Sequence, residues 1–398
     1  MKRTLPVFTI FLVFLAMGFG DAAGQLVSIV EKAFNVTPFM ASLVSFSGMI
    51  MFGVLSVPMG VQQSKIGKKK MLIIGLIFFL LGAMLPIINF TFPSILLAVL
   101  VMGAGATILQ VSGNPMMRDV SSEGKYASNL SFAQSLKAIG TLSTSLIIAI
   151  VGMSLMKYAW FRLPTEGGEA INIGFRILFP IFACVLLVTL ILVMFFVPNT
   201  SSEETNKPTT LRKCIKMLGN PYILIMTLGI FFYCGAEASM FNRIPSILTE
   251  NNPEITPTMG NIVLIVALFV GRFLGGIILR YISPKTFLYM TIAISILGNL
   301  MLFMPFNSIT TWTSFILIGI GFANIFPLIF SMCIDRYPEK SNEISGLMTT
   351  AIVGAAFVPL LTGLAANMNF KNAFLVTLAC LVYLTFVAIV NRKPVKHG

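Results

Sequence analysis

The sequence predicts an all-α membrane protein with twelve transmembrane helices in two pseudo-symmetric six-helix halves. The chain has 398 residues, of which 57% are hydrophobic and only 10% are charged, whereas a soluble domain has about 25% charged residues. Its apolar residues form twelve runs long enough to cross a bilayer. Glycines of the first six runs recur at a nearly constant spacing in the last six, which indicates a duplicated unit.

The predicted segments follow one another closely, so most loops are expected to be tight. The segments cover residues 6–33, 39–62, 71–88, 92–117, 126–153, 173–197, 221–248, 258–282, 285–306, 310–334, 343–367 and 370–391. The connection over 154–172 is longer, and so is a polar, basic one over 198–220. This pattern predicts an N-terminal half over 1–198, a cytoplasmic linker over 199–220 and a C-terminal half over 221–398.

The internal repeat rests on glycines at the same ordinal helix of each half. The Gly103-Ala104-Gly105 stretch and the Gly319-Ile320-Gly321 stretch lie 216 residues apart, in the fourth and tenth segments. Three further pairs have nearly the same offset, namely Gly60 with Gly276, Gly20 with Gly235, and Gly140 with Gly354. Two halves in parallel duplication are typical of a secondary transporter.

The placement of Lys and Arg predicts the orientation in the membrane. Of the 27 basic residues, 19 fall on the side of the N-terminus, five on the opposite side and three within helices. Because cytoplasmic loops carry an excess of Lys and Arg, both termini are expected in the cytoplasm of a multi-pass cell-membrane protein. The net charge of +13 is then a topology signal, and nucleic acid is not an expected partner.

Asp21 is the one charge in the apolar run from Leu5 to Val30. A carboxylate in a membrane helix costs about 2.5–3.5 kcal/mol on insertion scales, so it is expected to face a polar cavity or a partner. Gln25 and Ser28 share its helix face at i+4 and i+7. The acid is therefore either a functional, cation-coupling group or the acceptor of a structural hydrogen bond from a neighbouring helix.

The residue inventory argues against several other functions. The chain has a single His, His397, and five cysteines without CxxC spacing, which disfavours a His-based metal site or proton relay. No GxxxxGK[ST], HExxH or GxSxG motif is present, so neither a built-in ATP motor nor an enzyme is expected. We expect no cofactor and no bound metal.

Polar side chains recur at helical spacing in three further segments. The fourth segment carries Gln110 and Asn114, the fifth carries Gln134 and Lys137, and the seventh carries Tyr233, Glu237 and Phe241. Amide and charged groups need partners in a dry region, so the stripes predict a central cavity with most ligand contacts from the N-terminal half. The candidate substrate-binding residues are Gln25, Gln110, Asn114, Gln134, Tyr233, Phe241, Asn324 and Phe326.

Three charges at membrane depth are the candidate coupling residues. They are Asp21, Lys137 and Glu237, and the two acids occupy equivalent positions of the two halves. Lys137 either pairs with Asp21 in the resting state or acts independently of it, because a buried pair neutralises both charges yet still costs desolvation. Arg272, in the eighth segment, is expected to pack at the inner gate.

The connection between the second and third segments resembles a signature of the major facilitator superfamily. That signature is similar to G-x-x-x-D-R-x-G-R-R, and this chain has Gly60, Ser64, Lys65, Gly67 and Lys68 at the corresponding positions. Ser64 stands where the superfamily usually has Asp. Together with Arg272, these residues are the candidate gate.

The fourth and fifth segments, with Asn114-Pro115 and Phe132-Ala133-Gln134, resemble the fucose–proton symporter family of that superfamily. The resemblance implies that Asp21 is the proton-coupling acid and that Gln134 contacts sugar. Gln110 stands where the family has a second key residue, a glutamate. Further departures are Lys137 for asparagine, Glu237 for glutamine, Phe241 for tryptophan and Phe326 for tyrosine, so a sugar or polyol is expected rather than fucose itself.

The leading interpretation is a symporter that couples a monosaccharide such as fucose, glucose or galactose to a cation, by alternating access. The expected partners are the sugar, a proton or sodium ion, and the lipid bilayer, and the expected state is a monomer. Burial raises the pKa of a carboxyl by up to about 3–5 units, which would let Asp21 carry a proton at neutral pH. The alternatives are drug–proton antiport, and transport of a small organic anion or amino acid with Lys137 as counter-ion.

Overall fold

A computed structural model describes residues 4–21, 30, 34–155, 162–164, 170–172, 178–199, 210–251, 257–304, 307–369 and 371–391. The chain divides into two compact units. The first contains Met1–Val120 with Leu136–Glu203, and the second contains Ser121–Ser135 with Glu204–Gly398. The predicted domain boundaries at the linker remain a prediction.

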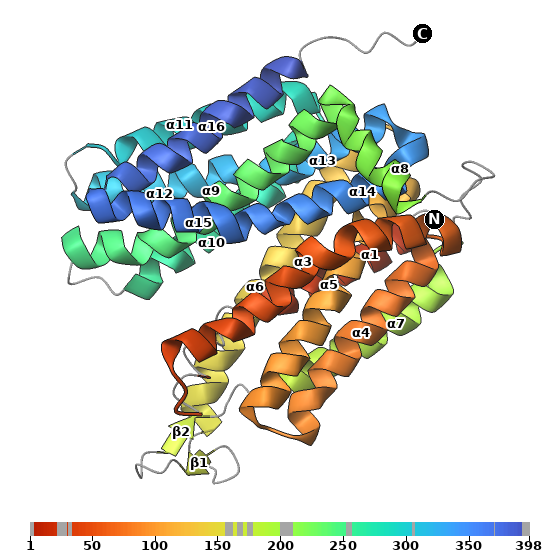
Figure 1. Cartoon of the computed structure of the whole chain (residues 1–398), viewed down its shortest axis with the longest axis horizontal. Coiled ribbons are helices and arrows are strands. Elements are labelled where there is room, and N and C mark those ends of the chain that lie inside the picture. The colour runs from red at the N-terminus through yellow and green to blue at the C-terminus, as the bar shows by residue number, and fades with distance from the viewer. Residues whose placement is uncertain are drawn as a thin grey trace. The chain divides into compact units, whose positions relative to one another are not determined.

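The first unit is built from helices of the first six segments (Figure 1). They are α1 (Thr4–Asp21), α3 (Pro38–Ile66), α4 (Lys68–Ile88), α5 (Phe92–Val120), α6 (Tyr126–Leu155, whose first ten residues pack in the second unit) and α7 (Leu178–Phe196). Helix α5 packs against α4, α3 and α1, and α7 packs against α4 and α1. Helix α5 is the centre of this unit, since most of its residues are buried.

The second unit contains helices of the last six segments (Figure 1). They are α9 (Pro221–Asn251), α10 (Pro257–Ile278), α11 (Pro284–Met301), α12 (Ser308–Phe322), α13 (Ile325–Arg336), α14 (Ser341–Thr350), α15 (Gly354–Met368) and α16 (Asn372–Val390). Helix α9 packs against α10, α13, α15 and α16, and α11 packs against α12 and α16. Each of the twelve predicted segments therefore contains a described helix or helix pair.

Length and hydropathy agree with a membrane protein. Among the described residues, eight helical stretches are long and apolar enough to cross a membrane, and Thr4–Gly20 is a shorter apolar helix. Many large apolar side chains are exposed along these stretches, for example Phe195 at 76% and Leu364 at 66%. Such an outward apolar surface fits lipid, which makes no demand for polar side chains. The predicted fold class is confirmed.

The same helix contacts recur in both units at the repeated glycines. A Cβ placed on Gly103 of α5 would lie 2.6 Å from the Cα of Gly48 in α3, and one on Gly319 of α12 would lie 3.1 Å from the carbonyl oxygen of Leu264 in α10. Gly48 and Leu264 are themselves 216 residues apart. The second glycines repeat the pattern, with Gly105 against Phe79 of α4 and Gly321 against Ser295 of α11. Close helix packing that only glycine allows is thus the physical basis of the repeat.

The connection between α3 and α4 is a single residue. Helix α3 ends at Ile66 and α4 begins at Lys68, whereas the sequence predicted a loop over about eight residues. Gly67 between them has φ 88°, a left-handed conformation that glycine adopts without a Cβ clash. The basic residues of this stretch therefore lie on helix ends.

Two predicted segments are interrupted helices. The tenth divides into α12 and α13 at Ala323 and Asn324, and the eleventh divides into α14 and α15 at a 3₁₀ turn, Ala351–Val353. The connection after α6 contains two short antiparallel strands, β1 (Arg162–Pro164) and β2 (Ala170–Asn172), with Leu163 opposite Ile171. The linker contains a short helix, α8 (Leu211–Lys216), followed by the 3₁₀ turn Met217–Gly219.

Candidate functional site

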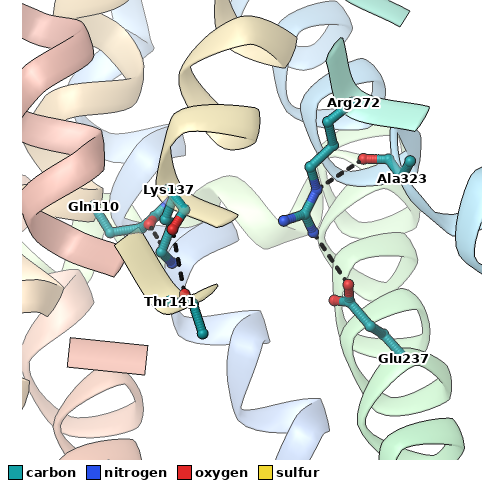
Figure 2. Close-up of polar contacts among 6 residues, drawn as sticks. All are labelled: Gln110, Lys137, Thr141, Glu237, Arg272 and Ala323. Atoms are coloured by element: carbon teal, nitrogen blue, oxygen red, sulfur yellow. Dashed lines mark hydrogen bonds and ion pairs between the residues drawn. The ribbon is translucent and has the colours of Figure 1, made fainter. Parts of the chain in front are cut away.

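A chain of polar side chains joins α6 to α5 in the first unit. The ammonium of Lys137 donates to Oε1 of Gln110 at 3.5 Å, and Nε2 of Gln110 donates to Oδ1 of Asn114 at 3.3 Å. Figure 2 shows the Lys137 and Gln110 side chains pointing toward one another. Gln110 and Asn114 are 1% and 0% exposed. The structure therefore brings Lys137 of one predicted stripe together with Gln110 and Asn114 of another.

The glycines of α1 and α6 bring the two backbones into contact beside this cluster. A Cβ on Gly18 would lie 2.9 Å from the Cα of Gly140, and one on Gly140 would lie 3.0 Å from the Cα of Gly18. The hydroxyl of Thr141 donates to the carbonyl oxygen of Gly18 at 3.0 Å and to that of Lys137 at 3.2 Å. The end of α1 is thereby fixed against the part of α6 that carries Lys137.

Two predicted residues of α1 cannot be placed as side chains. Asp21 is the last residue of α1, three residues after Gly18, but its side chain lies outside the described residues, as does the whole of Gln25. The resting pair between Asp21 and Lys137 therefore stays a prediction, and so does the role of Asp21.

Gln134 lies one helical turn before Lys137 on α6. Its side chain is 5% exposed, and its Nε2 has no hydrogen-bond partner among the described residues. A buried amide donor without a partner costs free energy comparable to a lost hydrogen bond. Gln134 thus offers a donor that a hydroxyl-bearing ligand can satisfy.

In the second unit an ion pair joins α9 to α10. Nη2 of Arg272 donates to Oε1 of Glu237 at 3.1 Å, and the two side chains are 14% and 19% exposed. Nε of the same guanidinium donates to the carbonyl oxygen of Ala323 at 3.2 Å. Figure 2 shows Arg272 reaching both partners. The sequence assigned Glu237 to coupling and Arg272 to gate packing, and it did not anticipate that the two are paired.

An aromatic cluster lies beside this pair. The ring of Tyr233, one turn before Glu237 on α9, packs 6.1 Å from the ring of Phe322 and 6.4 Å from that of Phe326. The Tyr233 hydroxyl is buried, lies near Arg272, and has no well-formed hydrogen bond among the described residues. Phe241, one turn after Glu237, is half-buried. Tyr233 and Phe326 thus combine apolar faces with a polar group, a combination that is typical of small-molecule binding sites.

Asn324 fills the interruption between α12 and α13. It is 1% exposed, and its Nδ2 donates to the carbonyl oxygen of Gly271 in α10 at 2.7 Å. A Cβ on Gly275 would overlap the Asn324 amide, so glycine at that position makes room for it. The amide oxygen of Asn324 has no partner among the described residues. Asn324 therefore connects two helices and retains one free acceptor.

The candidate gate residues at the α3–α4 turn form one ion pair that the sequence did not predict. The Lys68 ammonium lies 2.6 Å from Oδ2 of Asp119 at the end of α5. The Ser64 hydroxyl donates to the carbonyl oxygen of Val61 at 2.7 Å, within its own helix, and Lys65 is exposed. Gly60 is buried in α3. The sequence analysis did not identify Asp119 as a candidate. An acidic residue next to a basic one in the last turn of α5 was a visible signal for an ion pair.

Metal chemistry has no support in the described part of the chain. No group of three or more His, Cys, Asp or Glu residues that could hold a metal ion occurs there. Two groups of side chains, Lys137 with Gln110 and Asn114 in the first unit and Glu237 with Arg272 in the second, can each bind hydroxyl or carboxyl groups. Gln, Asn, Lys and Arg recognise these groups through amides and charges.

A family model described as Major Facilitator Superfamily matches residues 8–359 of this chain. The chain is 26% identical over 398 residues to a protein named glucose/galactose transporter from Brucella abortus biovar 1 (strain 9-941), with 96% of this chain and 93% of that protein covered. It is 23% identical to the L-fucose-proton symporter of Escherichia coli (strain K12), with 88% and 84% covered.

Solved structures show the same fold at low identity. A crystal structure of the transporter FucP in the outward conformation matches with a TM-score of 0.84 and 18% identity, over 99% of this chain and 100% of that one. The structure of the proton:xylose symporter XylE bound to 6-bromo-6-deoxy-D-glucose matches with a TM-score of 0.79 and 13% identity, over 99% and 96%.

Proposed function

The chain belongs to the Major Facilitator Superfamily, and on that premise we propose that it is a secondary active transporter that couples uptake of a monosaccharide to a proton. The observation that carries the proposal is the buried polar chain from Lys137 through Gln110 to Asn114. One turn away lies Nε2 of Gln134, which has no hydrogen-bond partner in the described part of the chain. Two relatives whose names include sugars match this chain over most of their lengths, and they support the substrate class.

The proposed roles follow from the chemistry of each group. Amides of Gln110, Asn114 and Gln134 bind sugar hydroxyls, because each amide both donates and accepts. The rings of Tyr233 and Phe326 cover apolar sugar faces. Asp21 exchanges the proton, because it is an acid in a membrane helix. No enzymatic step belongs to this proposal.

The test is solute counterflow and uphill uptake by the purified full chain in proteoliposomes. The panel contains glucose, galactose, fucose and a polyol, each measured under a proton gradient, a sodium gradient and no gradient. We expect at least one hexose to exchange without a gradient and to accumulate when a proton gradient is imposed. If none of the sugars exchanges, the proposed substrate class is refuted. If only a sodium gradient drives accumulation, proton coupling is refuted.

One observation favours a second candidate, the transport of a small organic anion. The Lys137 ammonium lies in the same polar chain as the amides of Gln110 and Asn114, and a cation there can attract a carboxylate. The two alternatives separate in the same assay when a sugar acid, an amino acid and their neutral counterparts are added to the panel. Preference for the anion over the neutral sugar of the same shape would favour this second function.

We further propose that the protein is a monomer in the cell membrane with both termini in the cytoplasm. The excess of Lys and Arg on one side of the predicted segments supports this orientation. A cysteine introduced at Gly167 is expected to react with an impermeant maleimide added outside intact cells. A cysteine at Thr205 is expected to react only after the membrane is opened, and the reverse result would overturn the orientation.

A further inference from the structure

The interruption between α12 and α13 leaves one carbonyl group without its helical partner. In a continuous helix the carbonyl oxygen of Ala323 would accept the N–H of residue 327. That residue is Pro327, which has no N–H. The helix resumes one residue later, where the N–H of Leu328 donates to the carbonyl oxygen of Asn324 at 3.0 Å.

Ala323 is 0% exposed, so its carbonyl group is shielded from bulk water. A backbone carbonyl in the bilayer core must be satisfied within the protein, because each unsatisfied group is costly there. Nε of Arg272 supplies the donor, at 3.2 Å. Gly271 beside it lets α10 approach, since a Cβ there would lie 2.6 Å from the Cβ of Ala323.

The same guanidinium also holds Glu237. Nε faces the helix interruption and Nη2 faces the carboxylate (Figure 2). The planar fork of arginine can satisfy two acceptors in fixed directions, whereas the ammonium of lysine is a flexible point charge. Arg272 therefore sets the position of the α9 carboxylate relative to the α12–α13 interruption.

The aromatic rings of the candidate site lie at this interruption. Phe322 ends α12 and Phe326 is in the first turn of α13, and the Tyr233 ring packs against both. A shift of the interruption would displace these rings from Tyr233. The geometry that a sugar would meet in this unit thus depends on the bond between Arg272 and Ala323.

We propose that Arg272 is a positioning residue for solute binding: it replaces the amide that Pro327 removes and thereby fixes the α12–α13 interruption against Glu237. The pair of Glu237 and Arg272 is then part of the binding framework and does not exchange the transported cation. The substrate part of this inference rests on the proposed function.

The central test is a double-substitution cycle on the full chain. Arg272→Lys keeps the positive charge and a contact to Glu237. It loses the second hydrogen bond, which the guanidinium donates to the carbonyl oxygen of Ala323. Pro327→Ala restores an N–H that can donate to Ala323. We expect Arg272→Lys to raise the half-saturating sugar concentration in counterflow about tenfold, as loss of a hydrogen bond to a charged group allows, with the maximal rate within about twofold.

In the Pro327→Ala background the same Arg272→Lys change is expected to raise the half-saturating concentration less than about threefold, because the backbone then supplies its own donor. Pro359→Ala is the matched control, since Pro359 lies inside a different helix, α15. Arg272→Lys is expected to keep its full effect in that background. Equal effects of Arg272→Lys in all backgrounds would overturn the proposal.

A second measurement needs no ligand. The fall in melting temperature caused by Arg272→Lys is expected to be smaller in the Pro327→Ala background than in the wild type or the Pro359→Ala background. This arm stays decisive even if no sugar in the panel is transported, so failure of the positioning role and failure of the proposed function are distinguishable.

The role of Glu237 is tested by the ratio of protons to sugar. We expect Glu237→Gln to weaken binding while the ratio and the pH profile of the maximal uptake rate stay those of the wild type. A changed ratio, or loss of uphill uptake with exchange retained, would make Glu237 a proton carrier and overturn that part of the inference.

Discussion

Removal of the Asp119 carboxylate should destabilise the first unit by a measurable amount. The ion pair of Asp119 with Lys68 joins α5 to the first turn of α4, with 2.6 Å between its atoms and side chains 15% and 9% exposed. Breaking a buried pair by removing one partner costs about 3–5 kcal/mol, and the partial exposure here reduces this to about 2–3 kcal/mol. At about 2–4 °C per kcal/mol, the melting temperature should fall by about 4–12 °C.

The assay is thermal unfolding of purified Asp119→Asn, Lys68→Gln and the double variant in one detergent. The double variant should lose less than the sum of the two single losses, because neither charge is then left alone. Lys70→Gln is the control, since Lys70 is exposed in the same first turn of α4, and it should change the melting temperature by about 1 °C or less. Additive losses, or no loss in the single variants, would refute the reasoning.

Three further predictions follow from other contacts. Gln134→Ala should weaken binding of every transported solute by about 1–3 kcal/mol in counterflow, because a ligand hydroxyl loses its partner, and unchanged binding would remove Gln134 from the site. Gly140→Val should abolish folding or transport, because a side chain there would overlap α1 near Gly18, and normal expression with full exchange would contradict that packing. Burial, with a smaller effect of Glu343, raises the pKa of the Cys214 thiol to about 12, so in a chain with the other cysteines replaced its alkylation should be slower than that of an ordinary thiol throughout pH 7 to 9 and should show no levelling as the pH approaches 9, and the rate and levelling of an ordinary thiol would contradict the burial of Cys214 in α8.

The sequence predicted the helix repeat because glycine leaves a direct trace of close packing. Gly103 and Gly319 mark the same contact in each unit, and the residues they touch, Gly48 and Leu264, are offset by the same 216 residues. Where close packing leaves no room for a side chain, the sequence has a glycine, and this is visible at a single position without knowledge of its neighbours in space. Helix number and type were predictable for the same reason, since a run of apolar residues is a local property.

The pairing of charges was not predictable in the same way. Glu237 and Arg272 lie on different helices, and their contact depends on how each helix is rotated about its axis, which depends on packing. The clue lay in Pro327, which removes the donor of Ala323 and so calls for a substitute. Lys68 was likewise predicted as a candidate gate residue from the loop signature, which accounts for its charge but not for its bond to Asp119.

The central claim, proton-coupled sugar transport through Asp21, is tested most directly by one comparison in proteoliposomes. Uphill accumulation and gradient-free counterflow of the best-transported sugar are measured in the wild type and in Asp21→Asn, under separate proton and sodium gradients. The account predicts that the wild type accumulates sugar under the proton gradient and that Asp21→Asn exchanges sugar without accumulating it. Uphill accumulation by Asp21→Asn would contradict the coupling assignment.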